Sequence, residues 1–340
     1  MLCPRFNRVR LLVLATVIVL PATRAHGQAA IADSKDQTKT SEQVAGPKTP
    51  PGELPNLLLE QSRSLADKGD FKQAERTIRQ YLDQHANSAD GHFLLGFILF
   101  KQGKPRASLA EYTQGAKFRD PSANDLQIVA LNYVLLEQYA DAGHWFTRSL
   151  EFNPNNPQGW YYLGRAKYSE NRFEEAISAF RQCLNRDPKN VKAEDNLGLS
   201  YQALGRMDEA LAAFREAIAW QAHMLERYPG PFLDLGILLL AQNQVQDAIS
   251  YLRQAVEISP QESRAHEQLG KAYSRLNELE KAQVELEKAV ALAPDSTPAH
   301  FMLGQVYRKR GLTEKAKIEL ERGAALQESR QHAKPLIPPN

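Results

Sequence analysis

Large apolar residues recur along most of the chain at helical spacing, in paired stretches separated by short polar breaks. Residues 160–176, WYYLGRAKYSENRFEEA, show one such pair, with a break at Asn171. Glycine and asparagine enter the left-handed backbone region at low cost and commonly end helices. The pattern therefore predicts pairs of antiparallel helices joined by tight turns. The breaks fall at Gly69, Gly103, Glu137, Asn171, Gly205, Asn243, Asn277 and Gly311, of which Glu137 departs from these residue types.

The paired unit repeats with a fixed period. Gly164 recurs every 34 residues as glycine, alanine or serine, except for one step of 38 residues between Gly198 and Gly236. The slot of Ala176 holds alanine or serine in every copy, and the slot of Cys183 is small in all copies but the first. Glycine inside a helix costs ~1 kcal/mol relative to alanine. Its recurrence predicts that the two helices approach closely and that a side chain at Gly164 would push them apart.

One copy carries the fullest set of recurring residues, which are Trp160, Leu163, Gly164, Ala176, Phe180 and Pro188. This skeleton and its period resemble the tetratricopeptide-repeat family. The resemblance extends over about residues 55–330 and implies an all-α fold, a right-handed α-solenoid of eight helix-turn-helix repeats. The expected repeats are residues 55–88, 89–122, 123–156, 157–190, 191–228, 229–262, 263–296 and 297–330.

The 38-residue step arises in the fifth copy, within EAIAWQAHMLERYPGP at residues 216–231. Four residues make about one helical turn. We therefore expect the second helix of this copy to be one turn longer and to end at Pro229, Gly230 and Pro231. Trp220, Met224 and Tyr228 would then cover the next repeat, with partner binding as the alternative role.

The first residues differ from the repeats. A segment with three arginines precedes the apolar run LLVLATVIVL, and the small residues Ala25 and Gly27 follow, as in a secretory signal peptide. The run is shorter than the ~20 residues that cross a bilayer. We therefore expect cleavage near Gly27 and an exported protein, periplasmic or secreted, without a membrane span; retention as an anchor is the alternative. Residues 28–54 are expected to be a disordered linker and residues 331–340 a flexible tail.

Charge and cysteine content narrow the class of partner. Removing residues 1–27 takes four arginines and no acid from totals of 42 basic and 40 acidic residues, which leaves a net charge near −2. A chain of that charge lacks the basic footprint of a nucleic-acid-binding protein. Only Cys183 remains after cleavage, so the exported chain has no internal disulfide. Because Cys183 occupies a small slot, we expect it to be buried and unreactive.

The repeats contain no motif of a catalytic, cofactor-binding or metal-binding site. The sequence has no phosphate-binding glycine loop, no HExxH, no CxxC and no GxSxG. His92, His266 and His300 occupy the slot of Trp160, which favours helix packing over metal ligation. We therefore expect no catalytic residues, no cofactor and no metal, and a protein that is not an enzyme.

The first helices of the second, third, fourth and sixth copies are unusually apolar on the face opposite the partner helix, whereas those of the last two copies carry basic residues there. At 100° per residue, the slots of Tyr161, Tyr162, Arg165 and Tyr168 fall on or beside that face. In the family that these repeats resemble, it lines a concave groove that holds extended or helical peptides. Burial between neighbouring first helices is the alternative explanation. The candidate partner-binding residues, from an aromatic end to a basic one, are Phe93, Phe97, Phe100, Ile128, Leu131, Tyr161, Tyr162, Arg165, Tyr168, Leu233, Ile237, Lys271 and Arg308.

These patterns favour a non-enzymatic adaptor that binds a peptide segment of a protein partner in the groove, within a cell-envelope assembly. Exposed apolar patches of this kind usually mark the site where a partner binds. Two alternatives stay open. The chain is a self-associating structural component, or it is a polysaccharide-handling subunit of an export apparatus, because aromatic grooves also stack sugars.

Overall fold

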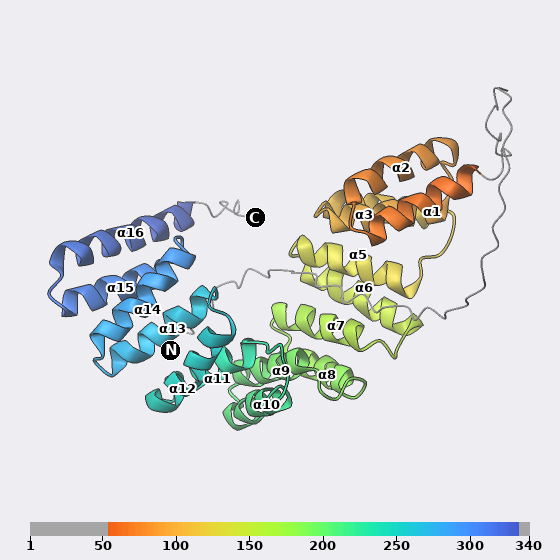
Figure 1. Ribbon diagram of the computed structural model, residues 1–340. Helices are drawn as coiled ribbons and strands as arrows, with labels where there is room; N and C mark the ends of the chain where they lie inside the picture. The colour runs from red at the N-terminus through yellow and green to blue at the C-terminus, as the bar shows by residue number, and fades with distance from the viewer. Residues whose placement is uncertain (1–53, 333–340) are drawn as a thin grey trace, which may run out of the picture. The chain divides into compact units, whose positions relative to one another are not determined.

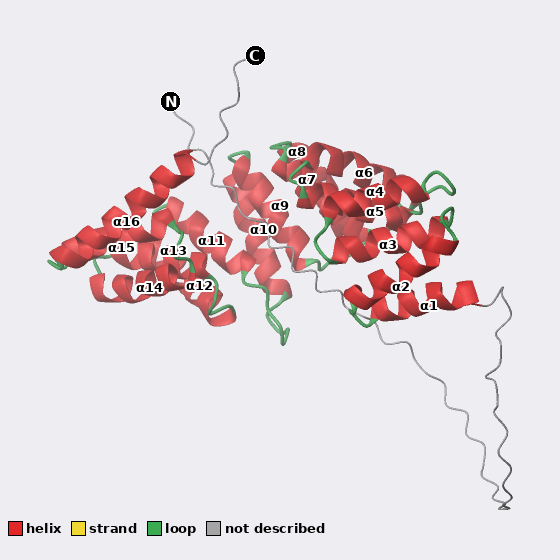
Figure 2. Cartoon of the chain, turned by 90° about the horizontal axis from the view of Figure 1, so that it is seen from above, coloured by secondary structure: helices red, strands yellow, loops and turns green. Residues whose placement is uncertain are grey.

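The computed structural model describes residues 54–332, which belong to one compact unit. All regular secondary structure in that range is helical (Figures 1 and 2). The predicted leader, residues 1–27, lies outside the described residues, as does the predicted linker except for Leu54, where the first helix begins. The last helix ends at His332, so it includes the first two residues of the predicted tail.

The helices of the described range form eight consecutive pairs. They are α1 (Leu54–Asp67), α2 (Phe71–Gln84), α3 (Ala89–Lys101), α4 (Pro105–Gly115), α5 (Ala123–Leu135), α6 (Tyr139–Phe152), α7 (Pro157–Ser169), α8 (Phe173–Leu184), α9 (Val191–Ala203), α10 (Met207–Trp220), α11 (Gly230–Ala241), α12 (Val245–Ile258), α13 (Ser263–Arg275), α14 (Leu279–Leu292), α15 (Thr297–Lys309) and α16 (Thr313–His332).

Each odd-numbered helix packs along the helix that follows it, and each even-numbered helix packs against the next pair. Most neighbouring odd-numbered helices also contact one another, as α9 does with α7 and α11, and α13 does with α11 and α15. We call the odd-numbered helices the first helices, because each opens its pair. Contacts that run only between neighbouring pairs are those of a solenoid. The structure therefore confirms the all-helical solenoid that the sequence predicts.

The turns inside the pairs adopt the left-handed conformation that the sequence predicts. Gly69, Gly103, Gly205 and Gly311 have φ between 71° and 81°. The asparagine turns have φ of 60° or 61°, as at Asn171. Glu137, the exception in residue type, still adopts φ of 59°. The turn geometry is therefore common to all eight pairs of the described range, whatever residue occupies it.

Gly164 makes room for a side chain of the partner helix. A Cβ added at Gly164 would lie 2.6 Å from Cε1 of Phe180, and one at Gly198 would lie 2.7 Å from Cε1 of Phe214. Phe180, Phe214 and Ala176 are fully buried. The close approach predicted from the sequence is confirmed, and its closest partner is the large side chain of the second helix.

The predicted extension of the fifth pair is wrong. α10 ends at Trp220 and α11 begins at Gly230, so the intervening residues form a loop. Gln221 closes this loop, since its Oε1 accepts a hydrogen bond of 2.6 Å from the backbone N–H of Tyr228. The tip is exposed, and Leu225 exposes its whole side chain. An added helical turn would have no surface to pack on, and packing supplies most helical stability in proteins.

In four of the described pairs, the residue in the slot of Trp160 joins the first helix to the preceding loop. The Nε1–H of Trp160 donates to the Pro154 carbonyl at 2.8 Å. In three other pairs a histidine Nε2–H donates to the carbonyl six residues earlier, and Nδ1 lies against a glutamate of the second helix. The Nδ1–carboxylate pairs are His92–Glu111 at 2.7 Å, His266–Glu285 at 2.6 Å and His300–Glu319 at 2.6 Å. These contacts confirm that the three histidines are packing residues.

We expect His300→Ala to lower the free energy of unfolding by about 2–3 kcal/mol, because it leaves the Pro294 carbonyl and the Glu319 carboxylate without their buried partner. Urea denaturation followed by circular dichroism measures the change. His223→Ala is the matched control, since His223 lies exposed in the α10–α11 loop. Equal stability of the two variants would contradict the bridging role of His300.

Candidate functional site

The structure places three of the predicted partner-binding residues in the core. Phe93 is 4% exposed, Phe100 8% and Leu233 6%. The Phe93 ring stacks on Tyr112 with 5.8 Å between ring centres, and an added Cβ at Gly115 would lie 2.5 Å from it. These side chains belong to the border of the predicted face, where packing of neighbouring helices buries them. Little of these three side chains is exposed, although Phe93 also lines a cleft between α3 and α5, and their role in partner binding stays a prediction.

The other predicted residues remain partly accessible on the first helices. We call the surface that they form the first-helix face, and their role in partner binding stays a prediction. Its members are the half-buried Phe97, Ile128, Leu131, Tyr161, Tyr162, Arg165, Tyr168, Ile237 and Lys271, and the exposed Arg308.

A cleft of about 640 Å³ opens on this face between α3 and α5. Its apolar lining includes Leu94 and Phe97 of α3 and Ile128 of α5. Its rim is polar, which the apolar pattern of the sequence did not reveal. The rim residues are Arg63, Asp90, Arg119, Asn124, Asp125, Gln127, Asn153, Asn156 and Gln158. We call this region the α3–α5 cleft.

Contacts within the rim hold several of its polar groups in place. The Arg119 guanidinium lies 2.9 Å from the Asp90 carboxylate and 5.2 Å from the centre of the Phe93 ring. Asn156 caps α7, and its Nδ2 donates to Oε1 of Gln127 at 2.7 Å. Each side-chain amide keeps further donor or acceptor capacity. The cleft thus combines an apolar lining with ordered hydrogen-bonding groups, as peptide-binding surfaces do.

The middle of the first-helix face is rich in tyrosine. Tyr161 and Tyr162 lie 5.5 Å apart between ring centres, and the Arg165 guanidinium lies 5.7 Å from the Tyr161 ring. Burial raises the pKa of the Tyr161 and Tyr168 hydroxyls, so both are neutral donors at physiological pH. Tyrosine beside arginine is common among the residues that dominate binding energy at protein interfaces.

Asp195 of α9 and Asp234 of α11 are a feature that the sequence prediction missed. They are 1% and 6% exposed, and we call them the acid pair. Burial raises the pKa of Asp234 to about 6. Burial and the charge of Asp234 together raise the pKa of Asp195 well above its ordinary value. The available signal was an acid in slots that hold Phe93 and Ile128 in other repeats.

The basic end of the face is formed by α13 and α15. Lys271 on α13 is half-buried and Arg308 on α15 is exposed. Arg264, at the start of α13, places Nη1 3.6 Å from Oδ1 of Asp234. The Arg275 guanidinium donates a hydrogen bond to the Leu240 carbonyl, so this side chain links the sixth and seventh helix pairs. The accessible basic residues Lys271 and Arg308 therefore lie on the first helices that come after α11, which carries Asp234 of the acid pair.

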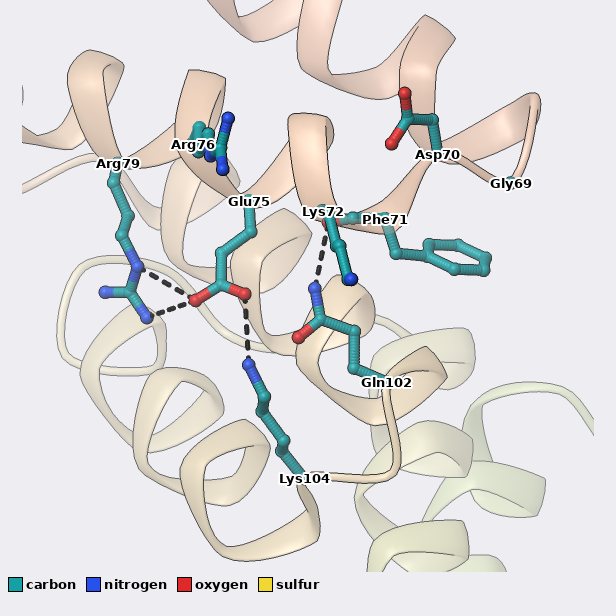
Figure 3. A pocket seen from close by; sticks show the side chains of 9 residues that line it. All are labelled: Gly69, Asp70, Phe71, Lys72, Glu75, Arg76, Arg79, Gln102 and Lys104. Carbon is teal, nitrogen blue, oxygen red and sulfur yellow. Dashed lines mark hydrogen bonds and ion pairs between the residues drawn. The ribbon is translucent and has the colours of Figure 1, made fainter.

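A second cavity, of about 780 Å³, lies between α2 and the start of α4 (Figure 3). Glu75 accepts hydrogen bonds from Arg79 at 2.9 Å and from Lys104 at 3.2 Å, and Gln102 donates to the Phe71 carbonyl at 2.9 Å. Burial raises the pKa of Glu75, but these hydrogen bonds outweigh it and the net pKa is lowered. The bonded groups join the first two pairs, so we assign this cavity a structural role.

Other chemistry is sparse in the described part of the chain. No group of three or more histidine, cysteine, aspartate or glutamate side chains there is arranged to hold a metal ion. Cys183 is fully buried, and burial raises its pKa to about 12, so its thiol is a poor nucleophile as expected. None of the described helices combines the length and apolar character that a membrane span requires.

Family comparison agrees with the fold. Models described as tetratricopeptide repeat match residues 59–124, 191–261, 239–288 and 267–333, which together exceed half of the chain. The chain is a tetratricopeptide-repeat protein. A further model, described as anaphase-promoting complex, cyclosome, subunit 3, matches residues 136–217. No curated protein matches the sequence.

Solved structures show the same fold in other tetratricopeptide-repeat chains. A tetratricopeptide repeat protein from Parabacteroides merdae is 20% identical with a TM-score of 0.62, over 75% of this chain and 99% of that one. Yeast Tom70 is 18% identical with a TM-score of 0.57, over 85% of this chain and 63% of its own. The Cut9–Hcn1 hetero-tetramer structure gives 18% identity and a TM-score of 0.57, over 79% of this chain and 52% of that chain.

Proposed function

We propose that this protein is a non-enzymatic scaffold that binds a peptide segment of a protein partner along its first-helix face. The α3–α5 cleft carries this proposal, because half-buried Phe97 and Ile128 line a hollow whose rim holds ordered amide groups. Apolar side chains of a partner would fill the hollow. The rim amides would hydrogen-bond its main chain, as groove-bound segments require.

The tyrosines beside Arg165 extend the same binding surface along α7. Half-buried aromatic rings supply contact area at low entropic cost, since they lose few rotatable bonds on binding. The predicted leader, residues 1–27, supports export to the periplasm or beyond the cell. We therefore place the binding function in a cell-envelope assembly.

We expect Phe97→Glu and Tyr161→Glu each to weaken peptide binding by at least about tenfold, because each puts a charge where apolar contact is needed. The full chain is first used to select binders from a random peptide library. Fluorescence anisotropy with a selected peptide then compares the variants. Phe152→Glu is the matched control, because Phe152 is 59% exposed at the end of α6, a second helix, and does not line the α3–α5 cleft.

Circular dichroism should show unchanged helix content in all three variants, since the substituted side chains are at least partly exposed. Binding that survives both Phe97→Glu and Tyr161→Glu, or that Phe152→Glu reduces equally, would refute this location of the site.

Self-association is the second candidate function. Ile318 of α16 is 58% exposed and Val284 of α14 is 49% exposed, so apolar side chains are also accessible on second helices. Light scattering over a range of protein concentrations tests it. A chain that stays monomeric at its working concentration removes this candidate and leaves peptide binding.

A further inference from the structure

The acid pair lies where first helices meet at the centre of the first-helix face. α9 and α11 contact each other, and the α10–α11 loop brings Tyr228 beside Asp195. Gly230 makes this contact possible, since an added Cβ there would lie 2.7 Å from Oδ2 of Asp195 and 2.4 Å from Cε1 of Tyr228. Because Gly230 has no side chain, the Asp195 carboxylate and the Tyr228 ring can both lie against its Cα.

One oxygen of Asp195, Oδ1, lacks a hydrogen-bond partner although the residue is almost fully buried. Its Oδ1 accepts no hydrogen bond, and no cationic group of the described residues lies within ion-pair distance of either of its oxygens. Burying such a group costs several kcal/mol unless it is paired or protonated. An unsatisfied buried acid is therefore a cost that packing alone does not explain.

Only one cation of the described residues forms an ion pair with the acid pair. Arg264 Nη1 lies 3.6 Å from Oδ1 of Asp234, longer than the 2.7–2.9 Å that is typical of a charge-assisted hydrogen bond. The Arg264 side chain is 46% exposed, whereas that of Asp234 is 9% exposed. Arg264 thus covers the pair loosely from the solvent side, and two carboxylates share this single distant cation.

The repeat architecture does not require acids at these two positions. The slot of Asp195 holds Phe93 and Leu233 in two other pairs and an acid, Glu267, in one, and the slot of Asp234 holds Ile128 in another pair. Natural chains tolerate residues that lower stability chiefly where function needs them. The two acids are therefore candidates for ligand recognition.

Three tyrosines lie near enough to the acid pair to interact with it electrostatically. The Tyr161 and Tyr228 hydroxyls interact electrostatically with Asp195, and the Tyr168 hydroxyl interacts with Asp234. Carboxylates bordered by aromatic rings are the chemistry that recognises lysine and arginine side chains, through charge-assisted hydrogen bonds and cation–π contacts.

We propose that the partner segment inserts a lysine or arginine side chain beside Asp195 and Asp234, displacing Arg264 and pairing with the unpartnered Asp195 oxygen. This inference rests on the proposed function, because the same first-helix face holds the segment. Charge complementarity selects the occupant, since a neutral or acidic side chain would leave the buried carboxylates unpaired. The acid pair then fixes the register of a segment whose apolar residues occupy the α3–α5 cleft.

The ionisation of the site predicts how this binding changes with pH. Both acids must lose their protons to pair with a cation, so affinity should rise between about pH 5 and about pH 8. The charged and titratable groups that face the pair or its tyrosines are Arg165 of α7, Lys192 of α9, Glu262 before the start of α13, Arg264 of α13, and the hydroxyls of Tyr161, Tyr168 and Tyr228.

The test uses the full chain and a positional library of peptides of about 12 residues, a length that spans several repeats when extended. Lysine or arginine should be enriched at one position. Replacing that residue by glutamine in a selected peptide should cost at least about tenfold in affinity. In the Asp195→Asn/Asp234→Asn variant, the lysine and glutamine peptides should bind equally, as a double-mutant cycle requires.

Two further variants separate recognition from structure. Arg264→Ala should not weaken the lysine peptide, because it removes the cation that competes for Asp234, whereas an anionic ligand would need Arg264. Glu226→Gln, in the exposed part of the α10–α11 loop, should leave the preference for lysine unchanged.

The outcomes distinguish the two proposals. Peptides that bind through Phe97 without preferring a cation, or that prefer aspartate or glutamate, overturn the cation site and leave the scaffold function standing. A library that yields no binder overturns both. A lysine preference that persists in the Asp195→Asn/Asp234→Asn variant also overturns the cation site, because the selectivity would then come from elsewhere.

Discussion

Gly164→Val should lower the free energy of unfolding by about 3–4 kcal/mol, because a side chain at this position overlaps the Phe180 ring. The valine methyl groups extend beyond a Cβ that would already lie 2.6 Å from Cε1 of Phe180. Gly164→Ala should cost less. The third pair shows that alanine fits this slot, since Ala130 and Phe146 are both fully buried there. Urea denaturation of the full chain measures both variants.

The control for these two variants introduces valine at a solvent-exposed position. Ala203 lies exposed near the end of α9, so Ala203→Val should cost only about 0.5 kcal/mol through helix propensity. Equal stability of the Gly164→Val and Ala203→Val variants would contradict the claim that close packing of α7 on Phe180 stabilises the α7–α8 pair.

The Asp195→Asn/Asp234→Asn variant should be more stable than the natural chain at neutral and alkaline pH. An acid with a higher pKa in the folded chain binds more protons when folded, so stability falls as pH rises from its unfolded to its folded value. For Asp234 that window runs from 3.8 to about 6. Each unit of pKa shift corresponds to ~1.4 kcal/mol, so the variant should gain on the order of 2–3 kcal/mol at about pH 8.

This gain should vanish below about pH 3, where the acids are protonated in both the folded and the unfolded state. Thermal or urea denaturation across the pH range gives the difference between the variant and the natural chain. Glu226→Gln is the control and should show little dependence on pH, since Glu226 lies exposed in a loop. A variant that is less stable than the natural chain at about pH 8 would show that the acid pair stabilises the fold.

The helix pairs could be predicted from sequence because each depends on contacts that recur. Gly164 and Phe180 belong to slots that meet in all six copies with glycine at the first of them, so one packing solution accounts for most of the array. Even Glu137 follows the turn geometry of its glycine and asparagine counterparts. The α10–α11 loop could not be predicted in this way, because an insertion has no counterpart in the other copies.

The candidate site was predicted only in part. Periodicity placed Phe97 and Ile128 on the first-helix face, but it could not show that Phe93, at the border of that face, packs against Tyr112 and Gly115. A helical pattern gives the direction of a side chain relative to its own helix, whereas burial at a border depends on the neighbouring helices.

The acid pair escaped prediction for a related reason. An isolated aspartate in a helical pattern usually faces solvent. Asp195 is buried because α11 and Tyr228 of the α10–α11 loop close over it, and that contact depends on the inserted residues. Its environment is therefore set by a part of the chain in which the repeat pattern is interrupted.

Photo-crosslinking at single positions tests binding along the first-helix face most directly. The photoreactive residue p-benzoylphenylalanine replaces either Phe97, in the α3–α5 cleft, or Phe152, exposed at the end of α6. With a peptide selected by the full chain, we expect a covalent adduct from position 97 and none from position 152. An adduct from position 152 alone, or equal yields from both positions, would contradict a binding site on the first helices.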